Sequence, residues 1–240
     1  MRVSVSTAGA QGSTESLGFA VSADGNFVVF TSDAQSLVPE LSYTATQTFL
    51  HDRAAGSTEV VSLSSDGEPN TDDTPWGSLT GFGAVSRDGS VVVFGTDDAF
   101  DTTDTNGTTD IYLRDRVNRE TSRVSIAENG DDPDGASSYP QISSDGRYVS
   151  FESRATNLVP GDTNEITDFF VKDLQTGRVR RVSLDDGGRQ VTQILSGLEG
   201  ILAASGRFVV FTPRDSLDSD PAAGIFIVEL SDGFWNSPPH

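Results

Sequence analysis

The sequence predicts a fold of the all-β class built from four similar units, and three observations support this prediction. A pattern of roughly sixty residues occurs four times along the chain. Each copy contains short runs rich in β-branched and aromatic residues, which favour strands. Glycine accounts for 24 of the 240 residues, as expected for a protein with many turns. We therefore expect a series of small antiparallel sheets.

Each unit begins with a tight turn followed by an apolar strand. These segments read VSADGNFVVF (21–30), VSRDGSVVVF (85–94), ISSDGRYVSF (142–151) and AASGRFVVF (203–211). Asp-Gly or Ser-Gly at the centre predicts a hairpin in which glycine adopts a positive φ. The turn glycines Gly25, Gly89, Gly146 and Gly206 are 64, 57 and 60 residues apart.

A second hairpin follows a variable loop in every unit. Its first strand lies in TFLHDRAAG (48–56), IYLRDRVNR (111–119), FFVKDLQTG (169–177) and IFIVELSDG (225–233). Gly56, Gly177 and Gly233 are expected at its turn. Its second strand is expected in EVVSLS (59–64), RVSIA (123–127) and RVSLD (181–185). The fourth unit lacks this run, and the matching residues RVSVS (2–6) begin the chain instead.

These units predict a β-propeller of four blades, each with four antiparallel strands A to D. We expect one domain, 1–240, with blades at about 18–64, 82–127, 139–185 and 200–233. Residues 2–6 are expected to supply strand D of the last blade and close the ring. The count from Gly206 through the termini to Gly25 is 59 residues, close to the internal period. We therefore expect a complete ring formed by a monomer.

Acidic residues are concentrated on one predicted face. The chain has 36 Asp and Glu against 16 Lys and Arg, a net charge of −20. The short hairpins place the B–C loops and D–A connections on the opposite face, where 25 acids and three bases give about −22. This polarity favours cations or basic protein surfaces as partners, and it disfavours nucleic acid, which needs a basic surface. The alternative explanation of the acidity is adaptation to high salt, which agrees with the presence of a single lysine, Lys172. Such adaptation would be expected to spread acids over every exposed surface.

Two of the long loops repeat one set of oxygen ligands at positions i, i+2 and i+6, directly before strand C. The residues are Asp104, Asn106 and Asp110 in blade 2, and Asp162, Asn164 and Asp168 in blade 3. Calcium takes six to eight oxygen ligands, and magnesium fits such a loop less well. The alternative is a simple Asx turn before each strand. Because the set repeats and the acids around it need a counter-ion, we expect calcium at both loops.

The other two units keep less of this set. Blade 4 has two acids and a glycine at the three positions, and blade 1 has none of the ligands. The residues are Asp218, Asp220 and Gly224 in blade 4, and Leu41, Tyr43 and Gln47 in blade 1.

Catalytic motifs are sparse in this chain. The absence of cysteine excludes thiol chemistry, disulfides and thiolate metal sites. The two histidines are His51 and His240, and Arg114 and Lys172 occupy the position of His51 in other blades. We therefore expect a solvent-facing strand residue at this position. No nucleophile elbow, phosphate loop or dinucleotide fingerprint is present.

Two further groups of residues are assigned structural roles. One acid recurs beside the C–D turn of the first three units and is expected to accept turn hydrogen bonds. Three aromatic residues near the long connections are expected to anchor their loops rather than to stack on sugars. These residues are Asp52, Asp115 and Asp173, and Trp76, Tyr139 and Trp235.

The repeat resembles a known family. Its motifs are similar to those of the TolB-like, WD-related propeller repeats of bacterial exported proteins. These motifs are SxDGxxVxF, the loop TNLVPGDTN (156–164), DxFVxD and RVS. The resemblance covers nearly the whole chain, although four units are fewer than the six or more common in that family. It implies a propeller in the periplasm or outside the cell that acts as an interaction scaffold, sometimes fused to peptidase or lyase chemistry.

The function expected from the sequence is a non-catalytic, calcium-binding scaffold whose acidic face binds a basic protein surface or a glycan. The alternative is a carbohydrate-active enzyme, a lyase or hydrolase, using carboxylates or His51 near the channel mouth. No apolar run approaches the eighteen or so residues of a membrane-spanning helix, so we expect no membrane span. We expect the protein to be extracellular or periplasmic.

Overall fold

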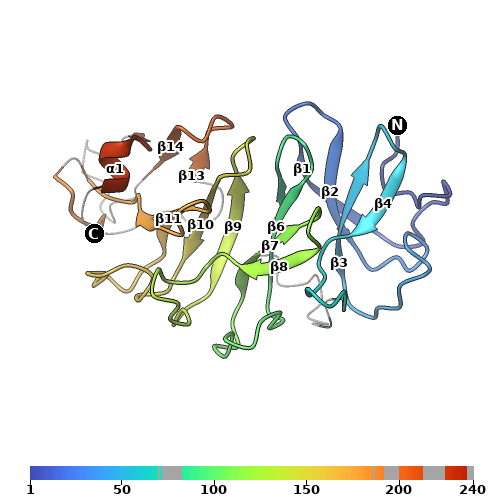
Figure 1. Ribbon diagram of the computed structural model, residues 1–240, viewed down its shortest axis with the longest axis horizontal. Coiled ribbons are helices and arrows are strands. Elements are labelled where there is room, and N and C mark those ends of the chain that lie inside the picture. The colour runs from blue at the N-terminus through green and yellow to red at the C-terminus, as the bar shows by residue number, and fades with distance from the viewer. Residues whose placement is uncertain (70, 72–82, 186, 192–199, 213–224, 237–240) are drawn as a thin grey trace, which may run out of the picture.

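The computed structural model describes residues 1–69, 71, 83–185, 187–191, 200–212 and 225–236 (Figure 1). Among these residues the chain forms fifteen strands and one short helix, and that helix is too short to cross a membrane. Several residues singled out in the sequence lie outside the described residues, namely Trp76, Asp218, Asp220, Gly224 and His240.

Three four-stranded antiparallel sheets follow the first three repeats. Sheet 1 contains β1 (Ser16–Val21), β2 (Phe27–Ser32), β3 (Gln47–Asp52) and β4 (Ser57–Val60). Sheet 2 contains β5 (Ala84–Val85), β6 (Val91–Thr96), β7 (Asp110–Asp115) and β8 (Glu120–Arg123). Sheet 3 contains β9 (Ser137–Ile142), β10 (Tyr148–Ser153), β11 (Asp168–Asp173) and β12 (Val179–Arg181). Neighbours in each sheet are neighbours in the sequence, which is the A-to-D order predicted.

The fourth sheet has three strands where four were predicted. Sheet 4 contains β13 (Gly200–Leu202), β14 (Phe208–Phe211) and β15 (Phe226–Glu229). After β15 the chain forms α1 (Asp232–Asn236), so the expected C–D hairpin at Gly233 is wrong. The helix replaces the hairpin because Trp235, which is buried, stacks on Tyr148 of sheet 3 with ring centroids 5.6 Å apart.

The prediction that residues 2–6 complete the last sheet and close the ring is not confirmed, since sheet 4 has three strands among the described residues. Val5 pairs with Gln11, and its carbonyl accepts a hydrogen bond from Thr58 Oγ1 of β4. The N-terminal segment therefore lies against sheet 1. Sheets 1 and 4 lie at opposite ends of the row of sheets (Figure 1), so a segment bonded to sheet 1 lies away from sheet 4 of the same chain. The four sheets form an arc that is not closed among the described residues.

The A–B turns have the predicted chemistry. Gly25, Gly89, Gly146 and Gly206 have φ of 75°, 69°, 73° and 68°. In the first turn, the Ser22 hydroxyl donates to Asp24 at 2.7 Å, and the backbone N–H of Phe27 donates to the same hydroxyl at 2.9 Å. The Ser and Asp of the repeated motif therefore close the hairpin through side chains.

The apolar core lies between neighbouring sheets. Between sheets 1 and 2, buried Val29 and Leu50 pack against buried Val85 and Val92. The next interface also includes residues 155–159 of the B–C loop, where Leu158 is 2% exposed. Because successive side chains of a strand point to opposite faces, each internal sheet contributes one face to the sheet before it and the other to the sheet after it.

Candidate cation site in the long loops

The long loops of each unit are bonded to one another. Thr105 of the B–C loop in unit 2 donates its N–H and hydroxyl to Asp132 of the D–A connection, at 2.9 and 2.7 Å. In unit 3, Asn164 Nδ2 donates to the carbonyl of Val191 at 3.2 Å. Both kinds of loop therefore lie on the same face, opposite the hairpins, as the sequence predicted.

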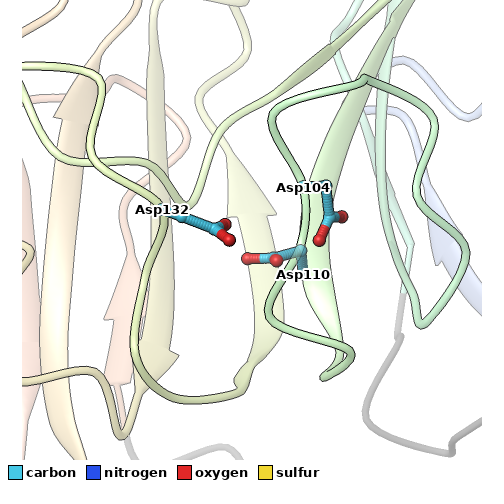
Figure 2. Close-up of side chains that lie close together, drawn as sticks. All are labelled: Asp104, Asp110 and Asp132. Atoms are coloured by element: carbon cyan, nitrogen blue, oxygen red, sulfur yellow. The ribbon is translucent and has the colours of Figure 1, made fainter.

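Three carboxylates converge on this face in unit 2 (Figure 2). Asp110 opens β7 and is fully buried, and Asp104 comes from the B–C loop. Asp132 reaches the same point from the D–A connection. One oxygen from each of the three lies within 4.8 Å of the others, which is a geometry that could hold a metal ion. The structure thus brings together two of the predicted ligands and adds Asp132, which the sequence did not indicate.

An arginine occupies the centre of this cluster. Arg123, the first residue of the RVS motif, ends β8 and has a side chain that is 1% exposed. Its Nη1 lies 3.4 Å from Asp104 and 3.3 Å from Asp110, and it donates a hydrogen bond to Asp132. Arg123 therefore supplies one positive counter-charge at the place where the sequence predicted calcium.

Burial changes the protonation of the two strand-side acids. Desolvation raises the pKa of Asp110 to about 6, although hydrogen bonds from Ser125 and Asn106 oppose the shift. Desolvation also raises the pKa of Asp104, against a hydrogen bond from Tyr112 and the charge of Arg123. With all three carboxylates ionised, the cluster has three negative charges and one positive, a net charge of −2. It can still attract a cation.

Asn106 adopts the Asx-turn geometry of the alternative interpretation. Its side-chain oxygen accepts the N–H of Thr108 at 2.8 Å, and its amide nitrogen donates to Asp110 at 2.8 Å and to the carbonyl of Pro133 at 3.0 Å. The amide thus presents hydrogens to the cluster. It would have to turn over before its oxygen could bind an ion.

Unit 3 has the same arrangement with one carboxylate fewer. Arg181 Nη1 lies 3.2 Å from Asp162 and 3.4 Å from Asp168. Gln190 stands where unit 2 has Asp132, since its side-chain oxygen accepts the hydroxyl of Thr163 at 3.0 Å. Two carboxylates and one guanidinium leave a net charge of −1, and desolvation raises the pKa of Asp162.

Unit 1 shows that the arginine and the acids occur together. Val60 pairs with Phe49 in the way that Arg123 pairs with Tyr112, so it holds the arginine position. At the strand-C position Gln47 replaces the aspartate and accepts the Ser62 hydroxyl at 2.8 Å. Units with the acid set have Arg, and the unit without it has Val. This co-occurrence was present in the sequence and could have identified the arginines.

The serine of the VS pair explains why this motif repeats. In unit 2 the Ser125 hydroxyl donates to Asp110 and accepts the N–H of Ile111 at 2.9 Å. The N–H of Val124 and that of Ser125 both point to the Ile111 carbonyl, at 2.7 and 3.4 Å, which ends the ladder in a bulge. Strand D therefore ends earlier than predicted, and Arg123 is its last residue.

The expectation that the His51 position faces solvent is wrong. His51 is 2% exposed, and its Nδ1 lies 2.9 Å from the hydroxyl of Thr58. At the same position Lys172 donates to the carbonyl of Val124 at 2.9 Å, and Arg114 donates to that of Ser64 at 3.0 Å. Lys172 and Arg114 are buried because they donate hydrogen bonds to backbone carbonyls just after strand D of the preceding unit. Desolvation lowers the pKa of Lys172 to about 8.

The predicted turn role of the recurring acids and the buried position of Trp235 are confirmed, whereas Tyr139, expected to anchor a loop, lies within β9. Asp52 accepts the N–H groups of Ala54 and Ala55, each at 2.9 Å. Asp115 and Asp173 accept turn N–H groups in the same way. Trp235 is 6% exposed and packs on its neighbours rather than forming an open platform.

The comparisons with known proteins relate the chain to β-propellers by structure alone. No protein-family model and no curated protein sequence matches it. TolB from Acinetobacter baumannii is similar with a TM-score of 0.51 and 18% identity, over 93% of this chain and 45% of that one. The β-propeller domain of the Trilobed protease from Pyrococcus furiosus, described with an open velcro topology, gives a TM-score of 0.50 and 13% identity over 89% and 54%.

An oligogalacturonate lyase in complex with manganese gives a TM-score of 0.51 and 13% identity, over 91% of this chain and 52% of that one. The chain thus spans about half the length of each of these three structures. At such low identity the likeness establishes the fold and no activity. TolB structures are among the neighbours, as the repeat resemblance implied, and the chain has the β-propeller type of fold over an arc of four sheets.

Proposed function

We propose that the protein is a non-catalytic interaction scaffold whose long-loop face binds a basic protein surface or a glycan. The observation that carries this proposal is the convergence of Asp104, Asp110 and Asp132 on the long-loop face of the row of sheets. A cavity of about 420 Å³ adds a concave feature between units 2 and 3. Glu128, Asn129 and Asn157 line it with polar groups, and Leu158 and Val159 make an apolar floor. Rigid sheets with functional loops at one edge are the usual basis of such binding.

A binding assay with defined probes tests the scaffold. The probes are an immobilised polyarginine peptide and a panel of neutral and acidic oligosaccharides. We expect one class to bind, with weaker binding in the variant Glu128→Gln/Asn157→Ala at the cavity. Val117→Ser is the matched control because Val117 is 76% exposed and lies in the C–D turn, at the end of β7 opposite to Asp110 and the long loops. Equal binding by both variants, or no binding to any probe, contradicts the proposal.

As part of the same proposal, calcium binds at the cluster of unit 2. Three carboxylates can offer several of the oxygens that calcium needs, and backbone carbonyls and water can offer the rest. Arg123 then has to move aside or share the carboxylates, which lowers the affinity. The set of Asp162, Asn164 and Asp168 in unit 3 is the weaker candidate because it has two carboxylates around Arg181.

Thermal unfolding with and without calcium tests this site. We expect added calcium chloride to raise Tm and a chelator to reverse the rise, because an ion that binds the folded state stabilises it by mass action. Asp132→Asn removes a ligand and should abolish most of the rise. Asp162→Asn, at the corresponding loop of unit 3, should leave most of it. An unchanged Tm in the unmodified protein rules out the calcium part of the proposal.

The alternative of a carbohydrate-active enzyme has little support from His51, which is buried away from solvent. The similar lyase shares only the fold with this chain. The test is turnover of acidic and neutral polysaccharides by the protein. Turnover that is lost in a carboxylate variant such as Asp104→Asn would show that the protein is an enzyme and would overturn the scaffold proposal.

We also propose that the protein acts in the periplasm or outside the cell. A weak calcium site fits that setting because extracellular modules bind calcium with dissociation constants of about 10⁻⁴–10⁻³ M. Fractionation of the cells that produce the full-length protein tests this placement, and recovery in the cytoplasm would contradict it.

A further inference from the structure

The most exposed large apolar side chains of the strands lie on the two end sheets. On sheet 4, Ile201 is 59% exposed and Ile227 is 66% exposed. On sheet 1, Val21 is 60% exposed and Leu17 is 39% exposed. No large apolar strand residue of sheets 2 and 3 is exposed to this degree among the residues the structure describes. The exposed apolar surface therefore belongs to the two ends of the arc.

The exposed residues of sheet 4 form one row across the sheet. Ile201 pairs with Val210, and Val210 pairs with Ile227, so the three side chains lie side by side on one face. The residues of the earlier sheets that match Ile227 in register are Leu50, Leu113 and Val171, which are 0%, 9% and 0% exposed. In those sheets this face packs against the sheet that follows.

On sheet 1, Val21 forms the complementary row, whereas Leu17 pairs with Thr31 and lies on the other face. Val21 pairs with Val28. The residues that match Val21 are Val85 in sheet 2 and Leu202 in sheet 4, each 7% exposed and each packed against the preceding sheet. The open face of sheet 1 is therefore the face that, in sheets 2 and 4, packs against the preceding sheet. The open face of sheet 4 is the face that, in sheets 1 to 3, packs against the following sheet.

The N-terminal segment lies on sheet 1 in the position that the end of strand D takes on the following sheet inside the chain. The bridge of Val5 to Gln11 repeats the bridges of Leu63 to Pro69 and of Leu184 to Gln190 at the ends of units 1 and 3. The Val5 carbonyl bonds Thr58 of sheet 1 as the Leu63 carbonyl bonds Thr121 of sheet 2. Residues 2–6 are thus placed on sheet 1 as the end of a strand D from a preceding unit.

We propose that sheet 4 of one copy of this chain docks on sheet 1 of a second copy, head to tail. The row of Ile201, Val210 and Ile227 then packs on Val21 and Val28, as Val29 and Leu50 pack on Val85 and Val92 within the chain. Residues 2–6 of the second copy lie along β15 as the fourth strand of sheet 4. The second copy is the occupant because the two faces lie at opposite ends of one chain (Figure 1). Such a contact uses two different surfaces, so copies form a ring or an open chain.

The turn glycine of sheet 1 adds a specific contact to this interface. Within the chain, Phe27 of sheet 1 lies against Gly89 of sheet 2, and Tyr148 of sheet 3 lies against Gly206 of sheet 4, leaving no room for a Cβ. Phe208 matches these aromatics in register. In the assembly its ring lies against Gly25 of the second copy, where the flexible side chain of Arg53 is the one group within 4 Å of an added Cβ and would move aside.

Mass in solution over a dilution series of the full chain tests the interface. We expect at least twice the chain mass of 25.4 kDa, falling to one chain mass in Ile227→Asp and in Val21→Asp. Val117→Asp, at an exposed residue of the C–D turn in sheet 2, is the control and should assemble as the unmodified protein does. Circular dichroism confirms that each variant is folded. A single chain mass at all concentrations overturns the proposal.

Mixing the two monomeric variants distinguishes a head-to-tail contact from a symmetric one. Ile227→Asp retains an intact sheet 1 face, and Val21→Asp retains an intact sheet 4 face. Their mixture should give a one-to-one dimer that grows no further, since each partner has one working face. A contact between two identical faces would not be restored by mixing, and this result would overturn the head-to-tail arrangement.

Cysteine cross-linking distinguishes a second copy from closure within one chain. The protein has no cysteine, so Val21→Cys/Ile201→Cys introduces the only two thiols. Oxidation should give a ladder of linked chains on a non-reducing gel. A linked species that remains at one chain mass would show that sheets 1 and 4 of the same chain meet, and would overturn the proposal.

Discussion

At the scale of single residues, the backbone conformation of each turn decides which residue it favours. Arg119 has a φ of 60° and stands where Gly56 and Gly177, with φ of 67° and 75°, end the C–D turns of sheets 1 and 3. Glu165 has a φ of 54° where the matching loop of unit 2 has Gly107. A residue with a Cβ pays about 1–2 kcal/mol in this region.

We therefore predict that Arg119→Gly stabilises the protein. The relief of strain exceeds the entropy that glycine loses on folding, so the free energy of unfolding should rise by about 0.5–1 kcal/mol. Denaturant unfolding measures the change. Gly56→Ala is the matched control, since nothing lies within 4 Å of a Cβ there and the strain alone should destabilise. A loss of stability in Arg119→Gly would contradict the argument.

The second residue-scale prediction concerns pH. The pKa of Asp110 is about 6 in the folded protein because burial disfavours its charge, whereas an exposed aspartate titrates near 3.9. Between these values the folded state binds more protons than the unfolded state. The stability that protonated Asp110 contributes is present below about pH 4 and is lost as the pH rises through about 6.

Asp110→Asn should remove this part of the pH dependence. In calcium-free buffer we expect the difference in free energy of unfolding between the two proteins to change by up to about 3 kcal/mol across that range, since each pKa unit corresponds to 1.36 kcal/mol. Denaturant unfolding at several pH values measures it. Parallel pH profiles of the two proteins would show that Asp110 does not titrate as described.

At the scale of elements, the end of strand D links the sheet to the loops. In units 2 and 3 its last residue is Arg123 or Arg181, and the guanidinium lies among the loop acids. In unit 1 the neutral pair Val60 and Gln47 occupies the same positions. Burying two charges is costly, but removing one partner leaves the other uncompensated, which costs more.

Arg123→Val should therefore destabilise the protein by about 3–5 kcal/mol, the loss typical of breaking a buried ion pair. Arg123→Val/Asp110→Gln copies the neutral pair of unit 1 and should regain part of that loss. Unfolding of the single and double variants at neutral pH, with a chelator present, measures both. A double variant no more stable than Arg123→Val would show that the two residues do not compensate each other.

Much at this scale could be predicted from the sequence. The strand runs and turn glycines of the first three units, and the A–B turn of the fourth, were found correctly because they depend on local propensity and on a positive φ. Strand D was placed a few residues late because its end is set by Val124 and Ser125 bonding one carbonyl of β7, a contact across the sheet. The Asp132 carboxylate was missed because it joins the cluster from a different loop.

At the scale of the whole molecule, four sheets pack in a row in which each internal sheet is covered on both faces. The two end sheets have one covered face each, and the exposed aliphatic rows of Val21 and of Ile227 mark the open ones. Stability in such repeats is a sum of unit and interface terms. The head-to-tail contact would give the end sheets the interface that the internal sheets already have.

The sequence by itself determined the repeat, the order of strands in each sheet and the acidity of one face, because these depend on local patterns that recur every sixty or so residues. Only the tertiary structure decided where residues 2–6 lie, that α1 replaces a hairpin, and that Arg123 stands among the acids. These features depend on packing between segments distant in sequence. A repeat fixes how one unit folds, whereas the curvature of the row decides which units meet.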